Sequence, residues 1–197
     1  MIVSIIGYKG GVGKTTTAVH VACYLQMLGS TLLVDGDDNR SSLHWARNGT
    51  LPIKVIDEKQ LARHARHYEH IVTDSEARPS FEELKQIAEG SDLIIVPTTA
   101  EELAVDALRQ AIEDLQKLDN QKWKILQTMV MPRPNKDAEE LRAMLKQLEL
   151  PSFTSWIRFR SAFRKATSEG IPVFDVKDPR ASEAWSDYEE VGKEILE

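Results

Sequence analysis

The sequence is poor in the features that cross-link a chain, carry it through a membrane or direct its secretion. Its 197 residues include one cysteine, Cys23, which excludes a disulfide framework and a cluster of thiolate metal ligands. No apolar run approaches the length of a transmembrane helix. No basic-then-apolar leader precedes the first apolar stretch. We therefore expect a cytoplasmic protein in which Cys23 is a small core residue.

Positive charge is also scarce. The chain has 25 Lys and Arg against 31 Asp and Glu, a net charge of −6 that taken alone argues against nucleic-acid binding. Such binding depends on a local patch, however, so the average does not exclude it. The 42% of hydrophobic residues is typical of a globular protein, and the length fits one domain over residues 1–197. We find no internal repeat, low-complexity tract or interdomain linker.

Short apolar runs alternate with amphipathic stretches along the chain. Strands that are apolar throughout are typical of a parallel sheet covered by helices on both faces. The pattern therefore predicts the α/β class, with a mostly parallel central sheet. Strands are expected at 2–6, 31–34, 53–56, 71–74, 92–97 and 123–131. Helices are expected at 14–28, 41–47, 58–66, 81–88, 103–118, 137–148 and 181–196.

Residues 7–17, Gly-Tyr-Lys-Gly-Gly-Val-Gly-Lys-Thr-Thr-Thr, join the first strand to the first helix. Glycines let backbone N–H groups turn toward an anion, and the helix N-terminus adds a positive dipole. In this spacing Lys14 reaches the β- and γ-phosphates of a nucleotide, and the Thr15 hydroxyl ligates magnesium. A plain turn between strand and helix leaves the Gly-Lys-Thr ending unexplained. The stretch therefore predicts a P-loop, the phosphate site of a nucleotide-binding protein.

Residues 9–16 resemble the deviant Walker A box of the ParA/MinD family of ATPases. Tyr8 stands where the general P-loop pattern has glycine, and Lys9 is an additional lysine. The resemblance implies that Lys9 reaches across a dimer interface onto the ATP of the partner subunit. It implies a catalytic role for Lys9 and Lys14. The implied nucleotide-binding residues of the loop are Lys9, Gly10, Gly11, Val12, Gly13, Lys14, Thr15 and Thr16.

Carboxylates follow two other apolar strands, at the sheet edge where open α/β folds bind ligands. Asp74 closes the strand 71–74 in the Walker B arrangement, so we expect it to contact magnesium, a helix N-cap being the alternative. Asp37 follows the strand 31–34 in a segment that resembles the family's Asp-x-Asp-Pro-Gln switch box. That resemblance implies that Asp37 polarises the attacking water and belongs to the magnesium site. Asp38 and Asn39 replace the Pro-Gln pair of the box.

Two further predictions concern the C-terminal half. The loop after strand 123–131 lies against the adenine in the family, which suggests this role for Arg133, although a plain turn is the alternative. Residues 151–168 contain no acidic residue, and basic and aromatic side chains alternate there. Contact with the phosphates of DNA and a solvated helix face beside core aromatics are the two interpretations. The basic residues are Arg158, Arg160, Arg164 and Lys165, with Lys177 and Arg180 as possible extensions.

The resemblance runs along nearly the whole chain and favours the DNA interpretation, since the segment 157–174 is similar to the closing part of small partition ATPases. It implies a short ParA-type ATPase, similar to ParF-like plasmid partition and McdA-like carboxysome-positioning proteins. Such an enzyme uses ATP and Mg²⁺, forms an ATP-dependent homodimer and binds nucleoid DNA non-specifically. A cargo adaptor protein activates its slow hydrolysis.

The last helix, 181–196, is acidic on its polar side and therefore does not suit a membrane surface. Two alternatives to the positioning ATPase remain. One is a metabolic ligase resembling dethiobiotin synthetase. The other is an ATP-gated adaptor that scarcely hydrolyses.

Overall fold

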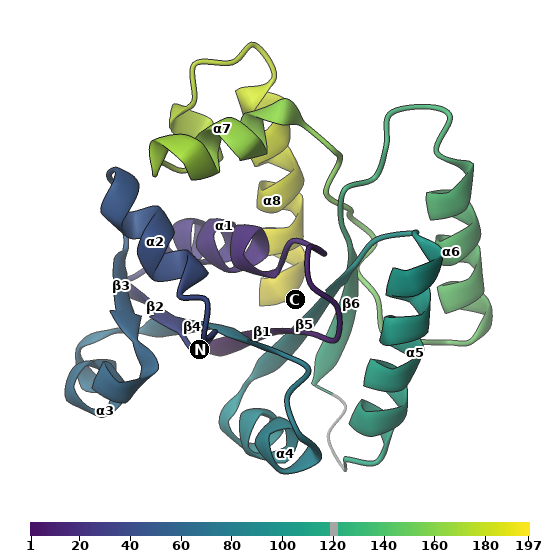
Figure 1. Ribbon diagram of the computed structural model, residues 1–197, viewed down its shortest axis with the longest axis horizontal. Coiled ribbons are helices and arrows are strands. Elements are labelled where there is room, and N and C mark those ends of the chain that lie inside the picture. The colour runs from purple at the N-terminus through teal and green to yellow at the C-terminus, as the bar shows by residue number, and fades with distance from the viewer. Residues whose placement is uncertain (119–121) are drawn as a thin grey trace.

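The computed structural model describes residues 1–118 and 122–197, which build one parallel sheet with helices on both faces (Figure 1). The six strands run in the order β3-β2-β4-β1-β5-β6, and every pairing between them is parallel. The predicted α/β class with a parallel central sheet is therefore confirmed. The strands are β1 (Ile2–Gly7), β2 (Thr31–Asp35), β3 (Lys54–Asp57), β4 (His70–Ala77), β5 (Leu93–Thr98) and β6 (Trp123–Gln127).

The helices divide between the two faces of the sheet. One face carries α1 (Lys14–Gln26), α2 (Ser41–Asn48), α7 (Ser161–Glu169) and α8 (Ala181–Leu196), which share one core with the central strands. The other face carries α3 (Leu61–His64), α4 (Phe81–Gly90), α5 (Glu102–Gln116) and α6 (Lys136–Gln147), packed in two further clusters. Short 3₁₀ turns cover Glu58–Gln60, Ala65–His67 and Val173–Asp175.

The strands are buried on both sides because successive side chains point to opposite faces of the sheet. In β5, Ile95 packs into the core beneath α1, while Ile94 and Val96 pack against α4 and α5. All six residues of β5 are buried, and so are all five of β2. This double burial explains why these strands appear in the sequence as continuous apolar runs.

Two predicted elements differ from the observed ones. The predicted strand 123–131 ends at Gln127, because Met129 adopts the left-handed region with φ 52° and breaks the extended backbone. Val130 instead makes an isolated parallel bridge to Arg158. The predicted helix 58–66 is divided into a 3₁₀ turn, the four residues of α3 and a second 3₁₀ turn.

Candidate nucleotide-binding site

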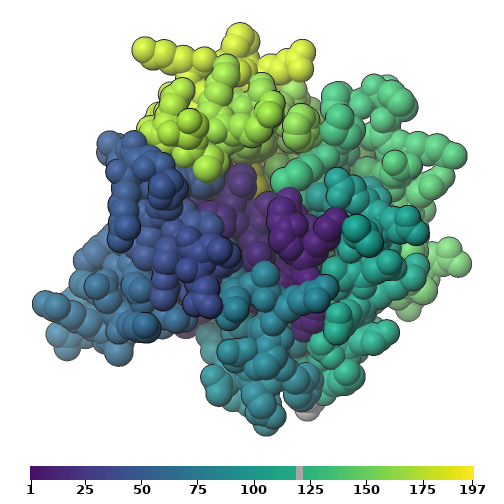
Figure 2. All heavy atoms as spheres, in the orientation of Figure 1, coloured from purple at the N-terminus to yellow at the C-terminus, as the bar shows by residue number. Residues whose placement is uncertain are grey.

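The predicted phosphate loop connects β1 to α1 at the C-terminal edge of the sheet. Gly11 and Gly13 have φ values of 82° and 87°, a left-handed conformation that side chains with a Cβ rarely adopt. Gly13 is the N-cap of α1 and no side chain caps this helix, so the first N–H groups remain available to an anion. In Figure 2 the purple N-terminal segment emerges in the middle of the face shown, bordered by blue, teal and green segments. The loop therefore has the geometry of an anion-binding nest.

Lys14 is held close to the loop. Its side chain is 8% exposed, and a Cβ placed on Gly7 would lie 2.9 Å from the Lys14 Cδ. Glycine at position 7 thus leaves room for the lysine stem to pass over the end of β1. The loop is also tied to the neighbouring strands, since the Thr128 hydroxyl lies 2.8 Å from the Val12 carbonyl oxygen and 3.1 Å from that of Thr98.

Asp74 is fully buried in β4 beside this loop. Its Oδ2 accepts a hydrogen bond from the Ser42 hydroxyl at 2.8 Å, while its Oδ1 is buried and has no hydrogen-bond partner. Burial raises the pKa of Asp74 to about 6, although the hydroxyls of Thr15 and Ser42 and the charge of Lys14 act in the opposite direction.

A buried carboxylate oxygen without a donor is costly unless a cation or a proton satisfies it. Asp74 and the Thr15 hydroxyl beside it therefore fit Mg²⁺, which prefers oxygen ligands. No three His, Cys, Asp or Glu side chains of residues 1–118 and 122–197 are grouped to hold a metal by themselves. Magnesium at this position would need phosphate oxygens and water as its further ligands.

Two carboxylates shape the loop that follows β2. Asp35 is fully buried and accepts hydrogen bonds from the N–H groups of Asp37 at 3.1 Å and Leu43 at 2.8 Å. Asp37 is 6% exposed, and its Oδ1 accepts from both the backbone N–H and the side-chain amide of Asn39, each at 2.8 Å. Asn39, where the family box has glutamine, therefore fixes the orientation of the Asp37 carboxylate. Sequence reasoning did not single out Asp35 or Ser42.

The Lys9 side chain contacts the start of α5. Its Nζ lies 3.2 Å from Glu101 Oε2, and Glu101 is the N-cap of α5. The lysine side chain is 28% exposed and that of Glu101 is 74% exposed, so solvent reaches the pair.

A cavity of about 120 Å³ opens beside the phosphate loop. Gly13 and Thr16 line it from the loop side, and Met129 and Phe159 line it from the segments that follow β6. The basic residues Arg158, Arg160 and Arg164 also border it. Arg133, predicted to contact adenine, is exposed and is not one of the lining residues, so this role stays a prediction.

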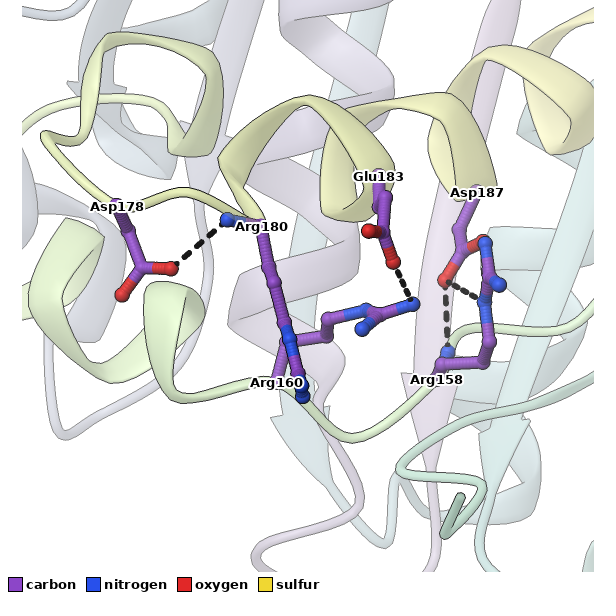
Figure 3. A network of polar contacts seen from close by, with 6 residues as sticks. All are labelled: Arg158, Arg160, Asp178, Arg180, Glu183 and Asp187. Atoms are coloured by element: carbon purple, nitrogen blue, oxygen red, sulfur yellow. Dashed lines mark hydrogen bonds and ion pairs between the residues drawn. The ribbon is translucent and has the colours of Figure 1, made fainter. Parts of the chain in front are cut away.

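Much of the positive charge predicted at 151–168 is paired with carboxylates from elsewhere in the chain (Figure 3). Arg158 Nε donates to Asp187 at 2.9 Å, and Arg160 pairs with Glu183 at 2.5 Å. Both acids lie on α8. Lys165 pairs in the same way with Asp178 at 2.6 Å.

Of the four basic residues predicted to contact DNA, Arg164 is the one for which the described part of the chain shows no ion pair. Its side chain is exposed. Lys177 and Arg180, the possible extensions, are exposed as well, and the Arg180 backbone N–H donates to Asp178 at 3.0 Å.

His20 is a buried histidine to which the sequence analysis assigned no role. Its Nδ1 lies 2.7 Å from the Thr16 carbonyl oxygen, so it donates there, and its Nε2 accepts from the Val173 N–H at 3.0 Å. The ring stacks on Tyr188 with centroids 4.8 Å apart, and the Tyr188 hydroxyl is 3.2 Å from that of Thr17. Burial lowers the pKa of His20 to about 4. The neutral imidazole thereby joins the phosphate-loop helix to the C-terminal helices.

Comparison with known proteins places this site in a family. A model described as the CobQ/CobB/MinD/ParA nucleotide binding domain matches residues 3–173. The chain belongs to this family. Two of its relatives are named maintenance of carboxysome distribution protein A. That from Gloeobacter kilaueensis is 29% identical, with 98% of this chain and 93% of the relative covered. That from Halothiobacillus neapolitanus is 23% identical, with 98% and 95% covered.

Solved structures show the same fold. Apo McdA from Cyanothece has a TM-score of 0.76 at 15% identity and covers 100% of this chain and 99% of its own. A putative plasmid partition protein from Borrelia burgdorferi bound to AMPPNP has a TM-score of 0.73 at 21% identity, with 99% and 97% covered. MinD from Aquifex aeolicus has a TM-score of 0.73 at 17% identity, with 99% and 96% covered. The match to the family model confirms the ParA/MinD resemblance of the sequence.

Among the described residues, no helix has the length and apolar character needed to cross a membrane.

Proposed function

We propose that this protein is an ATP-dependent positioning ATPase whose ATP-bound homodimer binds nucleoid DNA. A partner protein on the cargo stimulates hydrolysis and thereby releases the dimer. The whole-length similarity to carboxysome distribution proteins carries this proposal and favours a protein organelle over a plasmid as the cargo. The left-handed glycines of the loop and the buried Asp74 support the ATP chemistry that it requires.

The phosphate loop binds the triphosphate through its backbone N–H groups and the ammonium group of Lys14. Thr15 and Asp74 would hold Mg²⁺, which would supply positive charge to neutralise the phosphate oxygens. Asp37, oriented by Asn39, accepts a hydrogen bond from the attacking water and so positions and polarises it. Positioning and charge stabilisation of this kind are the main requirements for phosphoryl transfer.

Dimer formation requires Lys9 to leave Glu101 and contact the phosphates bound by the partner subunit. An exposed ion pair contributes only about 0–1 kcal/mol, so contact with a triphosphate outweighs it. Lys9 therefore couples the nucleotide state to the oligomeric state.

DNA binding by the monomer is expected to be weak, because three of the four basic residues are neutralised by carboxylates. Arg164 offers the free charge, and dimerisation doubles the number of phosphate contacts. Arg158, Arg160 and Arg164 border the cavity beside Gly13 and Thr16. This position supports coupling between the proposed DNA surface and the bound nucleotide.

The proposal is tested by gel-shift binding to unrelated DNA without nucleotide, with ADP and with ATP, over a series of salt concentrations. We expect the protein to bind DNA only when ATP is present, with an affinity that falls steeply as the salt concentration rises. Lys14→Ala is the matched control, which should bind no DNA under any condition. Equal binding in all three nucleotide states would contradict the proposed gating.

ATP turnover in the same experiments separates the alternatives. Turnover that responds to a metabolite and ignores DNA would favour a ligase. ATP-dependent DNA binding that persists without turnover, even with the cognate partner, would favour a weakly hydrolysing adaptor.

A further inference from the structure

A second cavity, of about 280 Å³, lies where β5 and β6 end and α5 and α6 begin. It shares Thr128, Met129 and Phe159 with the cavity beside the phosphate loop. None of the phosphate-loop residues 7–17 lines it. It is therefore distinct from the cavity beside the phosphate loop, and the phosphates of the nucleotide proposed above would not occupy it.

Two side chains in this cavity are more than nine-tenths buried and incompletely hydrogen bonded. Thr99 is 7% exposed and Gln127 is 6% exposed, and neither Thr99 Oγ1 nor Gln127 Oε1 has a partner. The Gln127 Nε2 donates to the Ala138 carbonyl oxygen at 3.2 Å, which fixes the amide so that Oε1 is the free atom. Buried polar atoms are normally satisfied, so these two indicate a missing hydrogen-bonding group.

The cavity also offers donors. Its lining includes Glu101 and Ala100 before α5 and the first turn of α6, and neither helix has a side chain that caps its N-terminus. The first N–H groups of such helices have no partner within the helix. An isolated anion is disfavoured, because two acidic residues, Glu101 and Asp137, are among those that line the cavity. A peptide group, which carries a donor and an acceptor, matches this mixed set.

The rest of the lining is apolar and partly open to solvent. Met129 is 40% exposed, Met131 56% and Phe159 42%. Methionine adapts its shape to a partner, and such side chains are common at protein-binding surfaces.

We propose that this cavity binds an extended peptide segment of a partner protein. The N–H of the segment donates to Gln127 Oε1, its carbonyl accepts from the Thr99 hydroxyl or a helix N–H group, and a neighbouring apolar side chain packs on Met129 and Met131.

Glu101 connects this cavity to the nucleotide cycle. It lines the cavity and also pairs with Lys9, at 3.2 Å. A peptide in the cavity therefore touches the residue that holds the lysine expected to reach the partner subunit. That the peptide belongs to the hydrolysis-activating partner rests on the proposed function, whereas peptide binding itself does not.

The test uses the full chain without nucleotide and N-acetyl-leucine-N-methylamide as the probe, followed by ¹H–¹⁵N NMR. A ligand of this size is expected to bind with a dissociation constant on the order of 1 mM. Shifted amide signals should cluster at residues 99–102 and 127–138.

Two variants and their controls make the test specific. Thr99→Val should weaken probe binding at least about fivefold without lowering the melting temperature, because Oγ1 bonds no protein group. Gln127→Met should weaken it similarly. Thr50→Val and Gln110→Met, both exposed, should bind the probe as the wild type does.

Equal probe binding by Thr99→Val and the wild type would overturn the proposal. The proposal would also be overturned if adenine shifted the same signals with equal affinity. A crystal of the probe-soaked protein that showed ordered water alone beside Gln127 would overturn it as well. Because no nucleotide is present, failure here leaves the proposed ATPase untouched, and failure of the ATPase leaves the peptide site untouched.

Discussion

Lys9 Nζ lies 3.2 Å from Glu101 Oε2, so a carboxylate of the same chain holds the lysine that distinguishes this phosphate loop. The two residues are 92 positions apart and meet where the loop passes the start of α5. The pair therefore competes with any contact that Lys9 makes across a dimer interface.

Removing the charge of Glu101 should favour the dimer. We expect Glu101→Gln to strengthen ATP-dependent dimerisation by up to about fivefold, because an exposed ion pair contributes about 0–1 kcal/mol. Sedimentation with Mg²⁺ and a non-hydrolysable ATP analogue measures this. Glu102→Gln, one residue further along, is the control and should behave as the wild type does. A weaker dimer in Glu101→Gln would show that the carboxylate supports association.

The two lysines of the loop should separate nucleotide binding from dimerisation. Lys14→Ala should abolish ATP binding in calorimetry, because its ammonium group is the loop's contact with the β- and γ-phosphates. Lys9→Ala should bind ATP but remain monomeric. Normal affinity for ATP in Lys14→Ala would refute the phosphate-loop assignment.

Asp37→Ala should bind ATP and lose turnover by about 10²-fold or more, because the attacking water loses its acceptor. The ATP-bound dimer should then accumulate on DNA. Phosphate release and gel shift measure the two effects. Asp38→Ala is the neighbouring control, since Asp38 is exposed, and it should retain turnover. Full turnover by Asp37→Ala would mean that another group positions the water.

Arg164 provides the cleanest test of DNA contact. Arg164→Ala should weaken DNA binding and reduce the slope of log affinity against log salt by about 1 per protomer, with no change in melting temperature. Arg158→Ala should in addition destabilise the fold, since Asp187 is 7% exposed in its side chain and would lose its guanidinium partner. An unchanged salt slope in Arg164→Ala would remove this residue from the DNA surface.

Two buried groups should make stability depend on pH in opposite directions. His20 has its pKa lowered from 6.5 to about 4 by burial, so its contribution is fully present above pH 6.5 and is lost as the pH falls toward 4. Burial raises the pKa of Asp74 from 3.8 to about 6, so its carboxyl group favours folding below pH 3.8 and loses this contribution as the pH rises through 6.

The two effects offset each other between pH 4 and 6, and a variant should separate them. In Asp74→Asn, the free energy of unfolding should fall by up to about 1.4 kcal/mol per pH unit as the pH decreases from 6.5 toward 4. Urea unfolding at several pH values measures this dependence. A flat profile in Asp74→Asn would mean that His20 is protonated in the folded protein at a higher pH.

Part of this structure could be predicted from local patterns. The phosphate loop and Asp74 lie beside each other because both are at the C-terminal ends of parallel strands, and the apolar runs of the sequence predict those strands. The exact ends of β6 could not, because the left-handed Met129 depends on contacts that the Thr128 hydroxyl makes with Val12 and Thr98. The division of the predicted helix 58–66 around α3 could not be predicted for a similar reason, since its apolar residues pack on β2 and β3.

By itself, the sequence determined the fold class, the family and the phosphate loop, because glycines, a lysine and a helix N-terminus act together over a few consecutive residues. The tertiary structure decided which charges remain free. Arg158, Arg160 and Lys165 look unopposed along the chain, yet each meets a carboxylate 13 to 29 residues away. Charge neutralisation depends on distance in space, and the packing of α7, α8 and the segments that precede them sets that distance.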